Sequence, residues 1–168
     1  MITAITIRER GATPRGMGKI MREATKAGYE ASGIWWHNEC RPKHFTREAY
    51  QLYQYTPRQG ESGTGTKIFK KSYTGRKLKK FGHTNPLVYT GVSERLTRAR
   101  DVRATSKGVR IVMSAPALNF RPKGGRINMV NELRERFTGR EVSMVAKIVD
   151  RVIDNKLKTA NETSTRTL

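Results

Sequence analysis

Cysteine is almost absent from this chain, because Cys40 is the only one in 168 residues. One thiol cannot form an internal disulfide, so a secreted scaffold held together by disulfides is excluded and a reducing compartment fits. Long apolar runs are also missing, and the N-terminal stretch MITAITIRERG reaches charge without an apolar signal-peptide core. The sequence therefore predicts a protein that is made in the cytoplasm and does not contact a membrane.

Acidic residues are scarce as well. The chain has 14 Asp and Glu against 34 Lys and Arg, a formal net charge of +20, and its apolar share of 36% is below that of ordinary globular proteins. Such a charge opposes compaction and is best tolerated against phosphates or acidic neighbours. We expect a small core and a polyanion or other protein subunits as partners. The alternative is a basic protein whose charge serves only to keep it in solution.

Catalytic groupings are few. The only pairing of a nucleophile with a base is Cys40 with His37 or His44, in a His-x2-Cys-x3-His spacing close to that of zinc sites. Pro42 interrupts this spacing, and a fourth ligand would have to come from far along the chain. The sequence predicts no enzyme, no metal and no cofactor. Packing and hydrogen bonding at a helix end is the ordinary interpretation of the cluster, and a zinc or thiol enzyme is the alternative.

Periodic patterns predict the regular elements. Apolar and small residues at three- and four-residue steps indicate an amphipathic helix from Met17 to Cys40, although Gly28 and Gly33 lower its helix propensity. Further helices are predicted at 47–53, at 93–100 with Ser93 as the N-cap, and from Arg140 to about 157. Alternation predicts a strand at 2–7 and a hairpin at 102–113 that turns at 106–108, while 115–125 reads as irregular.

These elements predict a single α+β domain over residues 1–158. A small, mainly antiparallel sheet is expected between a long N-terminal helix and a C-terminal helix. A long flexible basic loop at about 58–84 is expected to be mobile, because its first part, 58–66, is rich in glycine and hydroxyl residues. Residues 159–168 are polar and predict a flexible tail.

Cations concentrate in residues 67–81, which contain no acid. This basic arm interleaves Phe69, Tyr73 and Phe81 with lysines, a composition that suits phosphate contacts with base stacking and equally suits an acidic protein. Arginines between 95 and 110 extend this positive charge further along the chain. The alternative is that these cations form a face that contacts only solvent. The residues expected to contact a partner or DNA are Lys67, Lys70, Lys71, Arg76, Lys77, Lys79, Lys80, Arg95 and Arg98.

The segment Pro86-Leu87-Val88-Tyr89-Thr90-Gly91-Val92-Ser93-Glu94-Arg95-Leu96 resembles a stretch of the small neck and tail-completion proteins of tailed bacteriophages. In that family, a P-L-V-x-T-G-x-L-R-x-S-I pattern follows a long N-terminal helix and a mobile loop and leads into a hairpin. The order of elements expected here is similar and covers most of the chain. The sequence departs from the pattern at Val92-Ser93-Glu94, where an apolar residue followed by arginine is common.

The resemblance implies a structural virion protein that forms a homo-oligomeric ring at the head-tail junction, as a neck, tail-completion or tail-terminator subunit. It implies neighbouring portal, adaptor or tail-tube proteins as partners, with DNA passing through the channel as a further candidate. Thr90 and Gly91 are then the structural turn that orients the hairpin. A basic nucleic-acid-binding protein of ribosomal or architectural type is the alternative.

Overall fold

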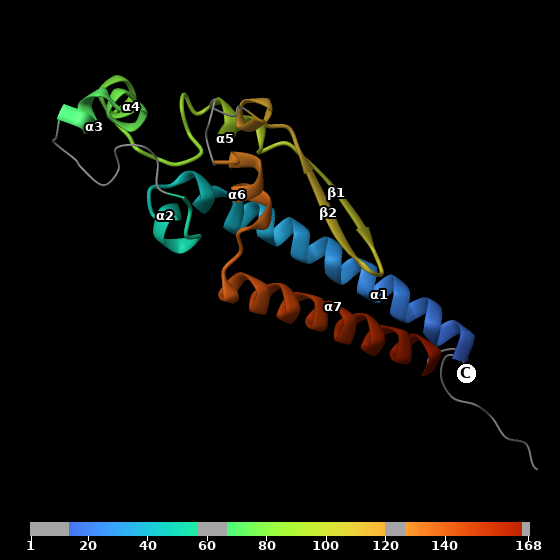
Figure 1. Ribbon diagram of the computed structural model, residues 1–168. Coiled ribbons are helices and arrows are strands. Elements are labelled where there is room, and N and C mark those ends of the chain that lie inside the picture. The colour runs from blue at the N-terminus through green and yellow to red at the C-terminus, as the bar shows by residue number, and fades with distance from the viewer. Residues whose placement is uncertain (1–13, 57–66, 120–126, 166–168) are drawn as a thin grey trace, which may run out of the picture.

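The computed structural model describes residues 14–56, 67–119 and 127–165. The two longest helices, α1 (Pro14–Trp35) and α7 (Gly139–Thr165), run side by side in opposite directions (Figure 1). The hairpin of β1 (Arg100–Thr105) and β2 (Gly108–Met113) also packs on α1. Helix α1 therefore lies between the hairpin and α7. The α+β class, with a small antiparallel sheet and long N- and C-terminal helices, is confirmed, but the expected place of the sheet between the two helices is wrong, because both helices lie on the same side of the hairpin.

The remaining elements are short. Helix α1 continues into a π-helical turn, η1 (Trp36–Cys40), and then a 3-10 turn, η2 (Arg41–Phe45), where Pro42 cannot continue the helical ladder. The others are α2 (Ala49–Leu52), α3 (Lys67–Lys71), α4 (Tyr73–Phe81), α5 (Val92–Leu96), the 3-10 turn η3 (Pro116–Asn119) and α6 (Met129–Glu135). Figure 1 shows α3 and α4 at one end of the molecule, away from the two long helices.

The predicted hairpin is present, but its turn is Ser106 and Lys107 alone, because Gly108, in β2, already pairs with Thr105. Val102 pairs with Ile111 and Ala104 with Val109, and all four side chains are half-buried. Their shared face packs on α1 at Gly33, where a Cβ atom would lie 2.7 Å from Cγ2 of Val109. The glycine that weakened the helix prediction is therefore required by a close approach between the helix and the hairpin.

Helix α7 begins with a capping box, Thr138-x-x-Glu141. The Glu141 amide donates to Oγ1 of Thr138 at 3.1 Å, and the Thr138 amide donates to Oε2 of Glu141 at 2.9 Å. Each side chain thus satisfies an amide that the helix itself leaves unpaired. The helix continues to Thr165, beyond the end near residue 157 that the sequence predicted.

The core of the described residues gathers near the end of α1, where α2, α6 and the segment before α5 meet. It consists of Phe45, Ala49, Tyr53, Tyr55, Leu87, Val88, Leu118 and Leu133. Leu118, in the stretch that the sequence predicted as irregular, is buried in this cluster. The segment 86–88, on which the resemblance begins, therefore contributes to the core.

Several predicted elements differ from the structure. Residues 67–81 form the helices α3 and α4, so the expected mobile loop at 58–84 is wrong for this part. Helix α6 lies in a stretch for which no helix was predicted, and Ser93 lies inside α5, whose N-cap is Gly91. The predicted strand at 2–7 and the glycine-rich stretch 58–66 fall outside the described residues. Among the residues described, no helix combines the length and the apolarity that a bilayer crossing requires.

Candidate functional site

The expected contact residues of the basic arm lie on two consecutive helices. Ser72 caps α4, because its hydroxyl accepts a hydrogen bond from the Gly75 amide at 3.1 Å, and Gly82 closes the helix in the left-handed conformation. Lys67 is the first residue of α3. The side chains of Lys70, Lys71, Arg76, Lys79 and Lys80 are exposed. A cluster of cations on short helices thus replaces the expected loop.

Lys77 is the exception among these cations. Its side chain is 1% exposed, and its ammonium donates a hydrogen bond to the Asn85 carbonyl. It also lies over the Tyr73 ring, with Nζ 5.6 Å from the ring centroid. The expectation that Lys77 contacts a partner therefore conflicts with this structure, in which the residue ties α4 to the segment that follows it.

The aromatic residues of the arm, like its cations, include both buried and exposed side chains. Phe69 is buried and cannot stack on a base in this arrangement. Tyr73 is exposed and stacks on Tyr89, with ring centroids 5.7 Å apart, and Phe81 meets Tyr89 edge-on at 4.9 Å. Lys80 lies 5.3 Å from the centre of the Phe81 ring. The exposed pair of Tyr73 from the arm and Tyr89 from the segment after it, next to lysines, retains the composition of a nucleic-acid contact.

The other two expected contacts follow the turn at Thr90 and Gly91. Arg95 lies on α5, and Arg98 lies in the turn after that helix. Gly91 has φ 82°, a left-handed conformation that favours glycine, and it begins α5. Arg95 and Arg98 are exposed, and Arg98 pairs with Glu94 at 3.5 Å. Exposed pairs of this kind stabilise a helix only slightly, so both arginines are available to a partner.

A buried arginine joins the end of α1 to α5. Arg41 donates to the Glu94 carbonyl at 3.2 Å and to Oγ1 of Thr97 at 3.0 Å, while Nε2 of His37 contacts the Thr97 carbonyl at 2.8 Å. Burial is the largest influence on the Arg41 guanidinium and lowers its pKa. The sequence analysis missed Arg41, although its position four residues after His37 indicates that both lie on one face of a helix.

The three residues with zinc-like spacing have different partners. His37 contacts Thr97, whereas Nδ1 of His44 contacts the Tyr55 hydroxyl and its ring stacks on Tyr53 with centroids 3.7 Å apart. Cys40 is buried near Glu141. Across residues 14–56, 67–119 and 127–165, no group of three His, Cys, Asp or Glu side chains is arranged to hold a metal ion.

The same cluster disfavours acid-base and thiol chemistry. Burial, with the neighbouring Glu141 carboxylate as a smaller cause, raises the pKa of Cys40 to about 12, so the thiol is protonated near neutral pH. Burial lowers the pKa of His44 to about 4, so its imidazole is neutral there. The Tyr53 hydroxyl donates to Oε1 of Glu141 at 2.7 Å, which ties the cluster to the cap of α7. The arrangement holds helices together.

Trp36 and Arg134 are further residues that the sequence analysis did not select. They line a groove beside β2, together with Arg110. No sequence signal marks them, because the groove forms only when β2, α6 and α7 come together. The capping box at the start of α7 did have a signal, Thr138 followed three residues later by Glu141, which was overlooked.

Comparison of the chain with models of protein families, with curated proteins and with solved structures finds no match.

Proposed function

We propose that this chain is a structural virion protein of a tailed bacteriophage, a ring-forming subunit at the head-tail junction. The proposal begins from the segment 86–96, which resembles the neck and tail-completion proteins, and from the similar order of elements. A subunit of this kind has no need of catalytic groups. It needs surfaces that are completed by neighbouring subunits.

The observation that carries the proposal is the exposure of apolar residues on both sides of the Gly91 turn. Tyr89 is 47% exposed and Val92 is 40% exposed, within the very segment that bears the resemblance. Neighbouring apolar side chains that remain in water commonly mark a contact with another protein. On this proposal, Thr90 and Gly91 fix the turn, and the exposed cations of α4 face the portal, adjacent subunits or passing DNA.

The hairpin gives additional support. Within the described residues, β1 and β2 form a sheet of only two strands, so the outer edge of each strand has no partner. An isolated pair of strands is marginally stable, and open edges favour association with another chain. A ring would place the outer edge of β1 against a neighbouring subunit.

The test is the mass and shape of the purified chain, by light scattering and negative-stain microscopy, alone and with isolated portals or tails. We expect rings for the natural sequence and a lower mass for Val92→Lys, because the substitution places a charge in the apolar contact. The matched control Val92→Thr keeps the side-chain shape and should still assemble. A chain that stays monomeric in every mixture would overturn the proposal.

The second candidate is a nucleic-acid-binding protein, favoured by the exposed Tyr73–Tyr89 pair beside the cations of α4. On this alternative, affinity for DNA or RNA falls steeply with salt. Replacing Arg76, Lys79 and Lys80 together by Gln should lower the slope of log affinity against log salt by about 2 to 3. A monomer with this behaviour would favour the second candidate over the ring.

A further inference from the structure

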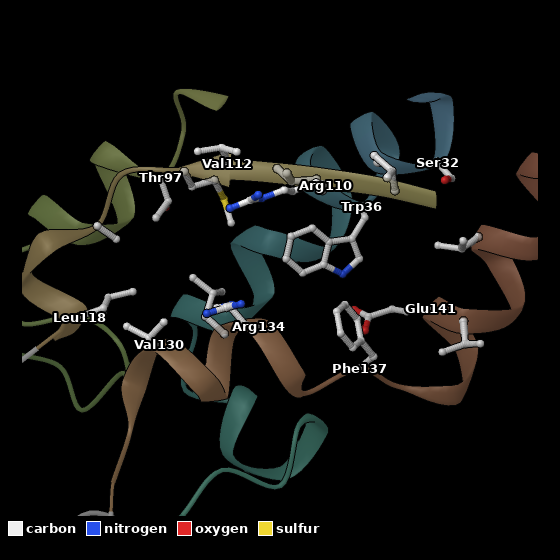
Figure 2. A pocket seen from close by; sticks show the side chains of 18 of the residues that line it. Ser32, Trp36, Thr97, Arg110, Val112, Leu118, Val130, Arg134, Phe137 and Glu141 are labelled. Carbon is white, nitrogen blue, oxygen red and sulfur yellow. The ribbon is translucent and has the colours of Figure 1, made fainter. Parts of the chain in front are cut away.

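A groove with a volume of about 720 Å³ runs beside β2, between that strand, α6 and the start of α7. Figure 2 shows β2 along one side, with the Trp36 and Phe137 rings near the middle and Leu118 and Val130 at one end. The volume falls in the range of about 300 to 1,000 Å³ that ligand-binding sites usually have. Its lining combines apolar side chains with arginines.

The groove borders the open edge of β2. Every residue from Val109 to Met113 lines it, and no residue of β1 does. Side chains of consecutive residues in a strand point to opposite faces, so an unbroken run of lining residues means that the strand presents its edge. Within the described residues β2 pairs only with β1. Its outward amides and carbonyls can therefore accept a further strand.

The polar groups of the groove are mainly hydrogen-bond donors. Arg110 and Arg134 reach toward it from β2 and α6, and no carboxylate of the described residues lies within ion-pair distance of either guanidinium. Trp36 is 7% exposed, and its indole Nε1 has no hydrogen-bond partner among the residues that the structure describes. Both carboxylate oxygens of Glu141, the one acid in the lining, are already hydrogen bonded.

We propose that this groove binds an extended acidic segment of a partner protein, which adds to β2 as a third strand. Apolar side chains of the segment fill the space against Trp36 and Phe137, and its carboxylates meet Arg110 and Arg134. In strand addition of this kind, main-chain hydrogen bonds provide the affinity, and pockets for the side chains provide the specificity. The proposal goes beyond the proposed function and applies equally to a ring subunit and to a nucleic-acid-binding protein.

Charge favours an acidic partner protein over a second copy of this chain. The chain has 34 basic residues and only 14 acidic ones, and no stretch of its sequence alternates acidic with apolar residues. A carboxylate between two guanidinium groups makes charge-assisted hydrogen bonds, which are stronger than neutral ones. Opposite charge also speeds the encounter of the two partners.

The probe is a fluorescein-labelled peptide, Asp-Leu-Asp-Phe-Asp-Leu-Asp, whose alternation separates apolar and acidic side chains in a strand. Binding to the full chain is measured by fluorescence anisotropy. We expect saturable binding of one peptide per chain. A peptide with Ser in place of Leu and Phe, and one with N-methylated backbone amides, should both bind at least about tenfold more weakly, because each loses one part of the recognition.

Variants of the full chain identify the site. Arg110→Gln with Arg134→Gln should weaken binding by about tenfold or more, since charge-assisted hydrogen bonds are lost. The matched control is Arg103→Gln, because Arg103 is directly opposite Arg110 in the hairpin but pairs with Asp101 and does not line the groove. It should change binding by less than about twofold. In a Trp35→Phe chain, the single remaining indole N–H resonance should shift on titration.

Several results would overturn the proposal. One is equal weakening by Arg103→Gln, which would mean attraction by overall charge alone. Another is binding that appears only after residues 1–13 are removed, which would assign the groove to the chain's own N-terminal segment. A third is self-association of the chain that is lost when Arg110→Gln and Arg134→Gln are combined. That result would assign the groove to a second copy of the chain. Absence of peptide binding or of an indole shift also counts against it, and neither of these two results bears on ring formation through Val92.

Discussion

Basic side chains behave differently in the interior and on the surface of this molecule. Arg41 and Lys77 are buried and donate hydrogen bonds to carbonyl groups, and His44 is buried and neutral. Lys79, Lys80 and Arg95 are exposed. The difference shows that net charge alone does not locate a binding surface, because some of the cations in the most basic segments stabilise the fold. Interior cations should affect unfolding, and surface cations should affect binding.

The largest effect is expected for Arg41→Ala. The substitution leaves the Glu94 carbonyl and Thr97 without their buried donor, and an unsatisfied buried group together with lost charged hydrogen bonds costs about 3 kcal/mol. The measurement is the free energy of unfolding in urea. Arg98→Ala, on the exposed side of the same junction, should change it by less than about 0.5 kcal/mol. Equal losses for the two variants would remove the distinction between interior and surface.

The second effect is a dependence of stability on pH through His44. Burial lowers the pKa of His44 to about 4, whereas an unfolded histidine titrates near 6.5. Between these values the unfolded chain binds the proton and the folded chain does not. Stability from this group is therefore constant above about pH 6.5 and falls as the pH drops toward 4, by a total of about 3 kcal/mol.

The test for His44 is the unfolding free energy from pH 8 to pH 4. His44→Gln should flatten the profile between pH 6.5 and 4, although it lowers stability at pH 7 by disturbing the contacts with Tyr53 and Tyr55. His83→Gln is the control, because His83 is only partly buried and should leave most of the slope in place. An unchanged slope in His44→Gln would show that another group causes the dependence.

The smallest effect separates two lysines of α4. Lys77→Met should destabilise the chain by about 1 to 2 kcal/mol, because the Asn85 carbonyl loses its donor. Lys80→Met should change stability by less than about 0.5 kcal/mol. If nucleic acid binds to this helix, Lys80→Met should lower the salt slope by about 0.9, while Lys77→Met should leave it unchanged. The reverse pattern would mean that Lys77 becomes exposed when the partner binds.

The sequence predicted the long elements well because their signals are local and repeated. The stripe of α1, the alternation of the hairpin and the stripe that begins after Arg140 each extend over several turns or residue pairs. Helix α4 was mistaken for part of a loop because its cations concealed its capping signals, Ser72 before it and Gly82 after it. Helix α6 is short, and its N-cap, Asn128, was overlooked.

The candidate sites depend on tertiary contacts that no local pattern reveals. Lys77 stands next to exposed cations in the sequence, and only the approach of Asn85 and Tyr73 explains its burial. The groove beside β2 draws residues from separated parts of the chain, including Trp36, Arg110 and Arg134. The zinc-like spacing of His37, Cys40 and His44 does not bring them to one site, because the change from π-helical to 3-10 turns directs them to different partners.

The close approach at Gly33 has a mechanical consequence. Because Val109 and Val102 fit around a residue without a side chain, the hairpin is held at one position along α1 and cannot slide without displacing a valine onto a bulkier neighbour. A neighbouring molecule that pulls on the hairpin along the strand direction therefore transmits its load directly to α1. Since α1 packs along α7, the load spreads over two long helices. The hairpin can therefore act as a rigid attachment point for a neighbouring molecule.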